Sequence, residues 1–220
     1  MVPTMASAAN FQVSPVTLTM LANRPVGSLT IKNADSVPVS IKVATYRWTL
    51  VDGKDVYTPT DDLIASPPIF TTAAHAGQLV RVGLRHRVPN AAYRVILEEI
   101  PGPSTADGIR IAMNLNLPLY VVVDPTAKAN VHWTVWRTAT GEVLLEGRNE
   151  GGAYQQVIGI DLIGPKKPVV LTTAMGVILP ANMRRWSIGK HPELATGASL
   201  QLSIRTVDGE DKVTANLVAR

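Results

Sequence analysis

The chain has 220 residues, of which 46% are hydrophobic, and this composition excludes a disordered chain and allows one or two domains. It has no cysteine, which excludes disulfides, zinc–thiolate sites and a cysteine nucleophile. The net charge of +4 comes from scattered basic residues, so we expect no nucleic-acid binding. No apolar run approaches the roughly 20 residues of a membrane helix, so we expect no membrane insertion.

The first eight residues are set apart from the rest by their small side chains. Ala6-Ser7-Ala8, followed by Ala9, is a small-x-small pattern typical of the end of a secretory signal peptide. A chance run of alanine and serine has the same composition. We therefore treat residues 1–8 as a signal-peptide remnant or a disordered start.

Apolar and polar residues then alternate with a period of two, which predicts strands with one buried face. In the first half the alternating segments are 11–13, 16–20, 28–32, 39–43, 79–82 and 93–97. Turn-forming residues separate them at 33–36, 51–54 and 74–77. No segment keeps a helical period with caps at both ends.

The second half repeats this pattern. Its alternating segments are 131–136, 156–160, 168–171, 200–204 and 213–217. The two halves meet near Val123-Asp124-Pro125, where proline cannot extend a central strand. Short strands at this spacing predict an all-β chain of two β-sandwich domains, 9–123 and 124–220.

One segment, 109–117, alternates over a greater length than an ordinary strand. Five apolar residues share one face, and we call them the donor row: Ile109, Ile111, Met113, Leu115 and Leu117. As the last strand of the first domain, this segment is expected at a sheet edge, where it could pair with a strand of another chain. An ordinary core strand would show the same period.

The sequence shows no catalytic or metal-binding constellation. The histidines are His75, His86, His132 and His191, and no metal-ligand spacing links them. Glu98 and Glu99 are adjacent on a predicted strand and should point to opposite faces, so they cannot act as an acid–base pair. The sequence has no glycine-rich phosphate loop and no nucleophile elbow. We therefore expect no enzyme activity, no catalytic residue, no metal and no cofactor.

Several segments together resemble the periplasmic chaperones of the chaperone–usher pilus pathway, and they occur in the order found in that family. In the first half they are 11–15, 28–33, 66–70, 78–82, 93–94, 98–101 and 117–121, and in the second half 177–180. Tyr93-Arg94 and Leu117-Pro118-Leu119-Tyr120-Val121 look like the archaic branch of the family.

The resemblance implies two immunoglobulin-like β-sandwich domains in an L or boomerang arrangement. It also implies a periplasmic chaperone that stabilises pilus subunits by donor-strand complementation and delivers them to an outer-membrane usher. Strand 109–117 would fill the open groove of the subunit, with the donor row as the inserted side chains. When no subunit is bound, the free protein could cap this strand by forming a dimer.

The chain departs from the family at the anchor for the subunit's C-terminal carboxylate. Well-known members use two basic residues, and the matching positions here are Thr17 and Pro118. We expect Arg94 to replace them, because its strand should pair with the end of the donor strand and arginine can hold a carboxylate with two hydrogen bonds. Arg81 and Arg85, expected on a neighbouring strand, are the next candidates. Internal salt bridges are an equally ordinary use of these arginines.

Two other functions are consistent with a chain of β-sandwiches. An extracellular adhesion or binding module of tandem immunoglobulin-like domains would carry its function in loops with exposed aromatic residues, but aromatic residues are only 5% of this chain. A hydrolase would need a nucleophile–base pair or a metal site.

Overall fold

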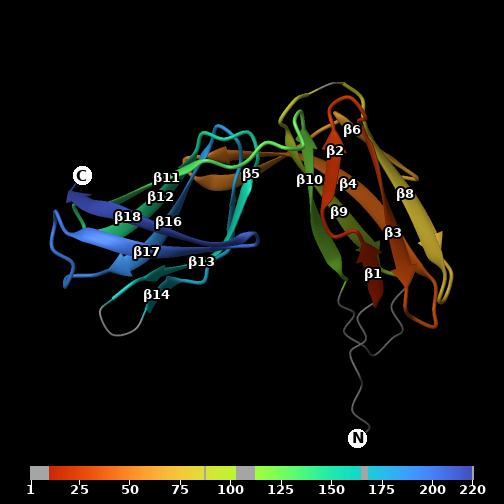
Figure 1. The fold of residues 1–220 in the computed structure, drawn as a ribbon. Helices are drawn as coiled ribbons and strands as arrows, with labels where there is room; N and C mark the ends of the chain where they lie inside the picture. Colours follow the sequence, from red (N-terminus) through yellow and green to blue (C-terminus); the bar gives the residue numbers. More distant parts are fainter. Residues whose placement is uncertain (1–9, 87, 103–111, 165–167, 220) are drawn as a thin grey trace, which may run out of the picture. The chain divides into compact units, whose positions relative to one another are not determined.

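The computed structural model describes residues 10–86, 88–102, 112–164 and 168–219, and the described part contains eighteen strands and no helix (Figure 1). The predicted all-β fold class is therefore confirmed. The chain divides into two compact units. The first unit runs to Trp48 and resumes at Tyr57–Pro125, and the second consists of Thr49–Val56 and Thr126–Arg220.

The first unit is a sandwich of two sheets. One sheet has the order β1-β3-β8-β6 and consists of β1 (Phe11–Ser14), β3 (Val26–Asn33), β8 (Gly77–Leu84) and β6 (Leu63–Ser66). The other has the order β2-β10-β9-β4-β5, and β7 also pairs with β4. Its strands are β2 (Leu18–Leu21), β10 (Asn114–Val122), β9 (Ala92–Ile100), β4 (Val39–Val51), β5 (Lys54–Pro59) and β7 (Ile69–Thr72), of which the ends of β4 and β5 within Thr49–Val56 are counted with the second unit.

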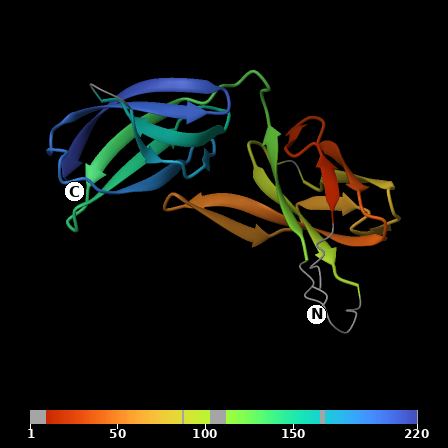
Figure 2. The same cartoon turned by 90° about the horizontal axis from the view of Figure 1, so that it is seen from below.

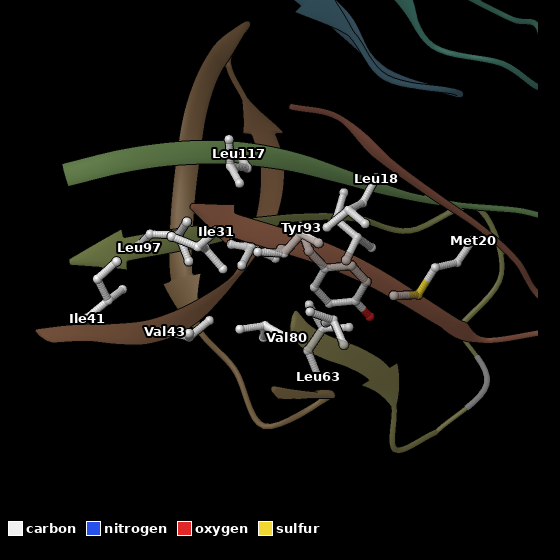
Figure 3. Close-up of a cluster of buried hydrophobic side chains, with 14 of the residues drawn as sticks. Leu18, Met20, Ile31, Ile41, Val43, Leu63, Val80, Tyr93, Leu97 and Leu117 are labelled. Carbon is white, nitrogen blue, oxygen red and sulfur yellow. The ribbon is translucent and has the colours of Figure 1, made fainter. Parts of the chain in front are cut away.

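Alternation builds the core of this sandwich. Along β9 the side chains of Tyr93, Val95 and Leu97 are fully buried, whereas Arg94 and Ile96 between them are only partly buried. Residues that face inward from the other sheet, such as Ile31 and Val80, meet them in one apolar cluster (Figure 3). Because consecutive side chains of a strand point to opposite faces, the period-two pattern of the sequence is sufficient to select this inner face.

The hairpin between β4 and β5 turns at Asp52 and Gly53, which both have positive φ, at 50° and 77°. Two consecutive residues with positive φ form the type I′ turn that suits a tight hairpin, and Asp-Gly is a preferred pair for it. The predicted turn at 51–54 is therefore present.

The second unit contains an eight-stranded sheet with the order β14-β13-β17-β18-β11-β12-β16, and β15 also pairs with β13. Its strands are β11 (Val131–Arg137), β12 (Glu142–Asn149), β13 (Gln155–Leu162), β14 (Val169–Thr172), β15 (Gly176–Ile178), β16 (Met183–Lys190), β17 (Ser199–Thr206) and β18 (Gly209–Ala219). Val143, Leu145, Leu202 and Leu217 are fully buried in a core of its own.

Candidate functional site: the half-paired strand β10 and the outer face beside it

Strand β10 is paired with β9 along most of its length on one side, but it is paired only along its last part on the other side. It pairs antiparallel with β9 from Asn114 to Tyr120, in a regular register. On its other side β2 runs parallel to it, but only from Leu119 to Val122. In Figure 1, β2 accordingly lies beside only the upper part of β10, and Figure 2 again shows β10 next to β9. In the described part of the chain, Asn114–Pro118 therefore has a free edge opposite β9.

Main-chain hydrogen bonds show which groups point to this free edge. The N–H of Val121 donates to the carbonyl of Ala91, and the carbonyl of Met113 accepts from the N–H of Glu99, so odd-numbered residues of β10 face β9. The carbonyl of Val122 accepts on the other side, from the N–H of Ala22. Because main-chain groups alternate along a strand, the N–H groups of Asn114 and Asn116 point to the free edge.

The predicted strand 109–117 and the observed strand differ in their bounds. The observed strand runs on to Val122, so the expectation that it ends at Leu117 is wrong. Pro118 does not end the strand, because its position is even-numbered and its nitrogen faces away from β9. The missing N–H therefore removes no hydrogen bond to β9, and β2 begins only opposite the next residue.

The donor row lies at increasing depth along the strand. Ile109 and Ile111 lie outside the described residues. Met113 and Leu115 are partly buried and pack against the edge of the first unit's core. Leu117 is buried inside that core and appears among the labelled side chains of Figure 3. In this structure Leu117 therefore packs with its own domain.

On the outer face of the same sheet, Arg94 stands in one cross-strand row with Tyr46 and Pro118. Its guanidinium carbon lies 3.8 Å from the ring centroid of Trp48 and 5.5 Å from that of Tyr57. Its Nε is buried and has no hydrogen-bond partner among the described residues. A cation that rests on aromatic rings and lacks a described acidic partner is suited to bind an external carboxylate.

The aromatic support of Arg94 could not be predicted from sequence. The Trp48 ring lies 6.3 Å from that of Tyr57 and 5.9 Å from that of Tyr120. Trp48 and Tyr120 flank Ala92 in one cross-strand row, where the small side chain lets the two rings meet. These residues lie far apart in the sequence, and only the strand order β10-β9-β4 brings them together.

The other two candidate arginines lie elsewhere. Arg81 is exposed on β8, which pairs with β3 and β6 in the other sheet, and Arg85 follows the end of that strand. The expectation that they lie on a strand neighbouring that of Arg94 is therefore wrong. Alternation within a strand does not encode which sheet the strand joins, and β8 pairs with β3 across about 50 residues of sequence.

Of the two family positions that lack basic residues, Pro118 lies beside Arg94, and Thr17 directly precedes β2. Leu18 pairs with Leu119, so Thr17 and Pro118 precede two paired residues of parallel strands. Pro118 in turn pairs with Arg94 on β9. The Arg94 guanidinium thus lies on the strand next to Pro118, the position where the family pattern has a basic side chain.

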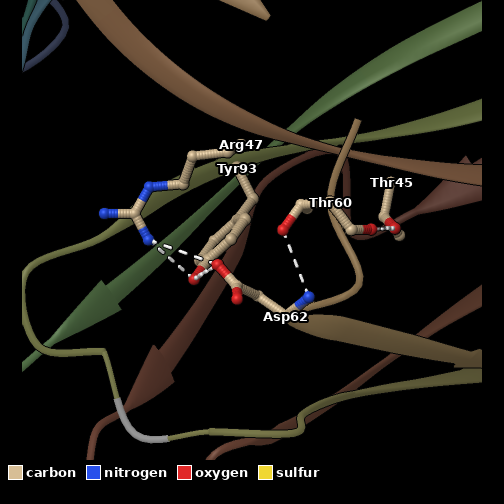
Figure 4. Close-up of polar contacts among 5 residues, drawn as sticks. All are labelled: Thr45, Arg47, Thr60, Asp62 and Tyr93. Carbon is tan, nitrogen blue, oxygen red and sulfur yellow. Dashed lines mark hydrogen bonds and ion pairs between the residues drawn. The ribbon is translucent and has the colours of Figure 1, made fainter. Parts of the chain in front are cut away.

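On the inner face, Tyr93 takes part in a polar cluster (Figure 4). Arg47 Nη1 donates to the Tyr93 hydroxyl over 2.8 Å, and this hydroxyl donates to Asp62 Oδ2 over 3.1 Å. Asp62 directly precedes β6, whereas Arg47 and Tyr93 lie on β4 and β9. The cluster therefore links the two sheets of the first unit. Burial raises the pKa of Tyr93 to about 12; Arg47 opposes this rise and Asp62 adds to it.

We expect Tyr93→Phe to lower the free energy of unfolding by about 1.5 kcal/mol, because it removes a hydroxyl that bonds to two charged groups. Since the pKa of Tyr93 rises from 10.0 to about 12 on folding, its contribution is complete below pH 10 and is lost as the pH rises through 12. Absorbance at 295 nm during an alkaline titration, compared between wild type and variant, measures this ionisation. Tyr57→Phe is the control. If the absorbance lost in Tyr93→Phe, relative to wild type, titrates near pH 10, the raised pKa of Tyr93 is contradicted.

In the described ranges, no group of three or more histidine and acidic side chains is close enough to hold a metal ion. The residues that the structure describes also form no helix that could cross a membrane. Glu98 and Glu99 do point to opposite faces: Glu98 is bound to Lys42 over 2.9 Å on the outside, and Glu99 is buried inside.

Solved structures of pilus chaperones resemble this chain in fold. A chain from the crystal structure of the "CsuC-CsuE chaperone-tip adhesion subunit pre-assembly complex from archaic chaperone-usher Csu pili of Acinetobacter baumannii" matches with a TM-score of 0.70 and 17% identity, covering 96% of this chain and 100% of that one. The E. coli chaperone DraB matches with a TM-score of 0.65 and 15% identity, covering 97% and 98%.

A third match comes from the Salmonella enterica SafA pilin in complex with the SafB chaperone, with a TM-score of 0.63, 15% identity and coverage of 98% and 99%. At these identities the matches show the fold, which is that of two-domain immunoglobulin-like chaperones. No curated protein sequence matches the chain.

The family itself is shown by a sequence match. The model of the family "Pili and flagellar-assembly chaperone, PapD N-terminal domain" matches residues 10–128, more than half of the chain. This match confirms the resemblance found in the sequence, and it is to a family of chaperones and not to a class of enzymes. The chain belongs to the family of pilus and flagellar-assembly chaperones.

Proposed function

We propose that this chaperone holds a pilus subunit by adding β10, together with the residues that precede it, to the subunit's incomplete sandwich. The free edge of Asn114–Pro118 is the observation that carries the proposal. Among the described residues its main-chain groups on this edge are unpaired, whereas β9 orders the strand by pairing with its opposite edge. Strand addition at such an edge is a known mode of peptide recognition, and chaperone–pilin complexes are an established example of it.

The inserted side chains are those of the donor row that precede Leu117. Met113 and Leu115 are the described members, and Ile109 and Ile111 continue the alternation in the sequence. Burying each such side chain contributes about 1.5–3 kcal/mol before the cost of association is subtracted. Leu117 keeps its place in the chaperone's own core and anchors the strand from which the others extend.

Arg94 binds the C-terminal carboxylate of the subunit in this proposal. It stands beside Pro118, at the end of the free edge, and aromatic rings hold its guanidinium in place. A planar guanidinium can donate two parallel hydrogen bonds to a carboxylate, and it loses little side-chain entropy when it is already ordered. Arg81 and Arg85 lie on or next to the other sheet and serve as comparison sites.

The same proposal places the protein in the periplasm and makes an outer-membrane usher the recipient of the subunit. Tyr93-Arg94 and the run from Leu117 to Val121 favour the archaic branch of the family. Holding a subunit by strand addition uses no catalytic step and no cofactor. In the absence of a subunit, the free edges of two copies could pair with each other.

Co-expression with a pilus subunit from the same source tests this function. Two forms of the subunit are compared: the natural form, with an open groove, and a form whose groove is filled by a fused copy of its own complementing strand. The open form should co-purify as a one-to-one complex by light scattering, and the filled form should not bind. Equal binding of both forms, or no binding of the open form, would contradict strand addition. Light scattering of the chaperone alone reports whether it dimerises.

A further inference from the structure

Glu99 is a carboxylate in an otherwise apolar row. On the inner face of β9 it follows Tyr93, Val95 and Leu97, which are fully buried, and only 6% of its own surface is exposed. A buried carboxylate is costly unless hydrogen bonds replace its water. Its position at the end of this row therefore calls for a specific partner.

One hydrogen-bond partner of the Glu99 carboxylate is the main chain of Met113, a member of the donor row. The N–H of Met113 donates to Glu99 Oε2 over 2.9 Å, and the N–H of Glu99 donates to the carbonyl of Met113 over 3.0 Å. The regular register between β10 and β9 includes the neighbouring pair, Asn114 and Glu98, but not Met113 and Glu99. In a continued ladder the main-chain carbonyl of Glu99 would accept from Met113. Here the side chain of Glu99 accepts this hydrogen bond, and the ladder ends.

We infer that Glu99 is a positioning residue that fixes where the donor segment leaves the chaperone's own sheet and, with it, the register in which Met113 is offered to a subunit. The inference rests on the proposed function. A hydrogen bond to a carboxylate is roughly twice as strong as one between neutral groups, so it holds this exit point firmly. The register matters because a shift of one residue moves every side chain of a strand to the opposite face.

Three variants separate this role from simple core packing. Glu99→Leu fills a similar volume and removes the acceptor, Glu99→Gln keeps an acceptor oxygen, and Glu98→Ala is the control on the exposed face of the same strand. The first measurement is amide hydrogen exchange of the free protein. Exchange of the Met113 amide should become at least about tenfold faster in Glu99→Leu, and Glu99→Gln should restore most of the protection. Exchange at Leu97 should not change.

The second measurement is the affinity for the open subunit. Glu99→Leu should bind at least about tenfold more weakly, Glu99→Gln should recover most of the affinity, and Glu98→Ala should bind like the wild type. Unchanged exchange at Met113 in Glu99→Leu would overturn the inference, and so would faster exchange with unchanged affinity. If the wild type binds no open subunit, the proposed function fails and the inference fails with it. If the wild type and Glu99→Leu bind equally well, only the inference fails.

Discussion

Met113→Asp should weaken subunit binding at least about 100-fold while the chaperone stays folded. The substitution removes an apolar side chain worth about 1.5–3 kcal/mol on burial and places a charge where the subunit groove is apolar, and each 1.4 kcal/mol is a factor of about ten in affinity. Met113 is only partly buried at the edge of the chaperone's own core, so the folded state tolerates a polar side chain there better than at Leu117. Isothermal titration or surface-based binding with the open subunit measures the effect.

Asn116→Asp is the matched control for this prediction. Asn116 lies on β10, which begins directly after Met113, and it is exposed on the opposite face. It therefore introduces the same charge three residues away without entering the groove, and binding should change by less than about threefold. Thermal unfolding by circular dichroism checks that both variants are folded. If both variants lose affinity equally, charge on β10 and not the donor row controls binding.

Arg94→Gln should weaken subunit binding by about 10- to 100-fold, because hydrogen bonds to a charged group are worth about 1.5–3 kcal/mol. Arg94→Lys should recover little of this loss, since an ammonium cannot reproduce the planar fork that rests on Trp48. Arg81→Gln and Arg85→Gln should leave the affinity unchanged, because both arginines lie away from the sheet that contains β10.

A double-mutant cycle shows whether Arg94 acts on the subunit's C-terminal carboxylate. The second change is a short glycine extension of the subunit, which moves the carboxylate away from its normal place. The extension should weaken binding to the wild type and have little further effect on Arg94→Gln, so the two losses should not add. Additive losses would mean that Arg94 stabilises the chaperone itself, through its contacts with Trp48 and Tyr57.

The sequence was sufficient for the all-β class and the family because both depend on local pattern. Val95, Leu97 and their counterparts alternate with residues that are only partly buried, and burial of one face of a strand has this period. The same pattern could not place Arg81, because the pairing of β8 with β3 and β6 depends on contacts distant in sequence. It also could not show that Pro118 continues the strand, since this depends on which edge its nitrogen faces.

The site residues missed by sequence reasoning were missed for a related reason. The rings of Trp48 and Tyr57 lie near Arg94, and Tyr120 packs against Trp48 from β10, so the strand order brings these residues together. Glu99 did leave a signal, because a carboxylate at an inward position after Tyr93, Val95 and Leu97 breaks an apolar row. Its partner, the main-chain N–H of Met113, carries no side-chain signature at all.

Amide hydrogen exchange at the free edge of β10 tests the central claim most directly. The N–H groups of Asn114 and Asn116 point away from β9, so they should exchange readily in the free chaperone and at least about tenfold more slowly in the one-to-one subunit complex. Val95 and Leu97, on a strand paired on both sides, should be protected in both states. Protection of Asn114 and Asn116 that appears only in the complex is the result expected from strand addition. A stable complex in which both amides exchange as fast as in the free protein would show that the subunit is held elsewhere.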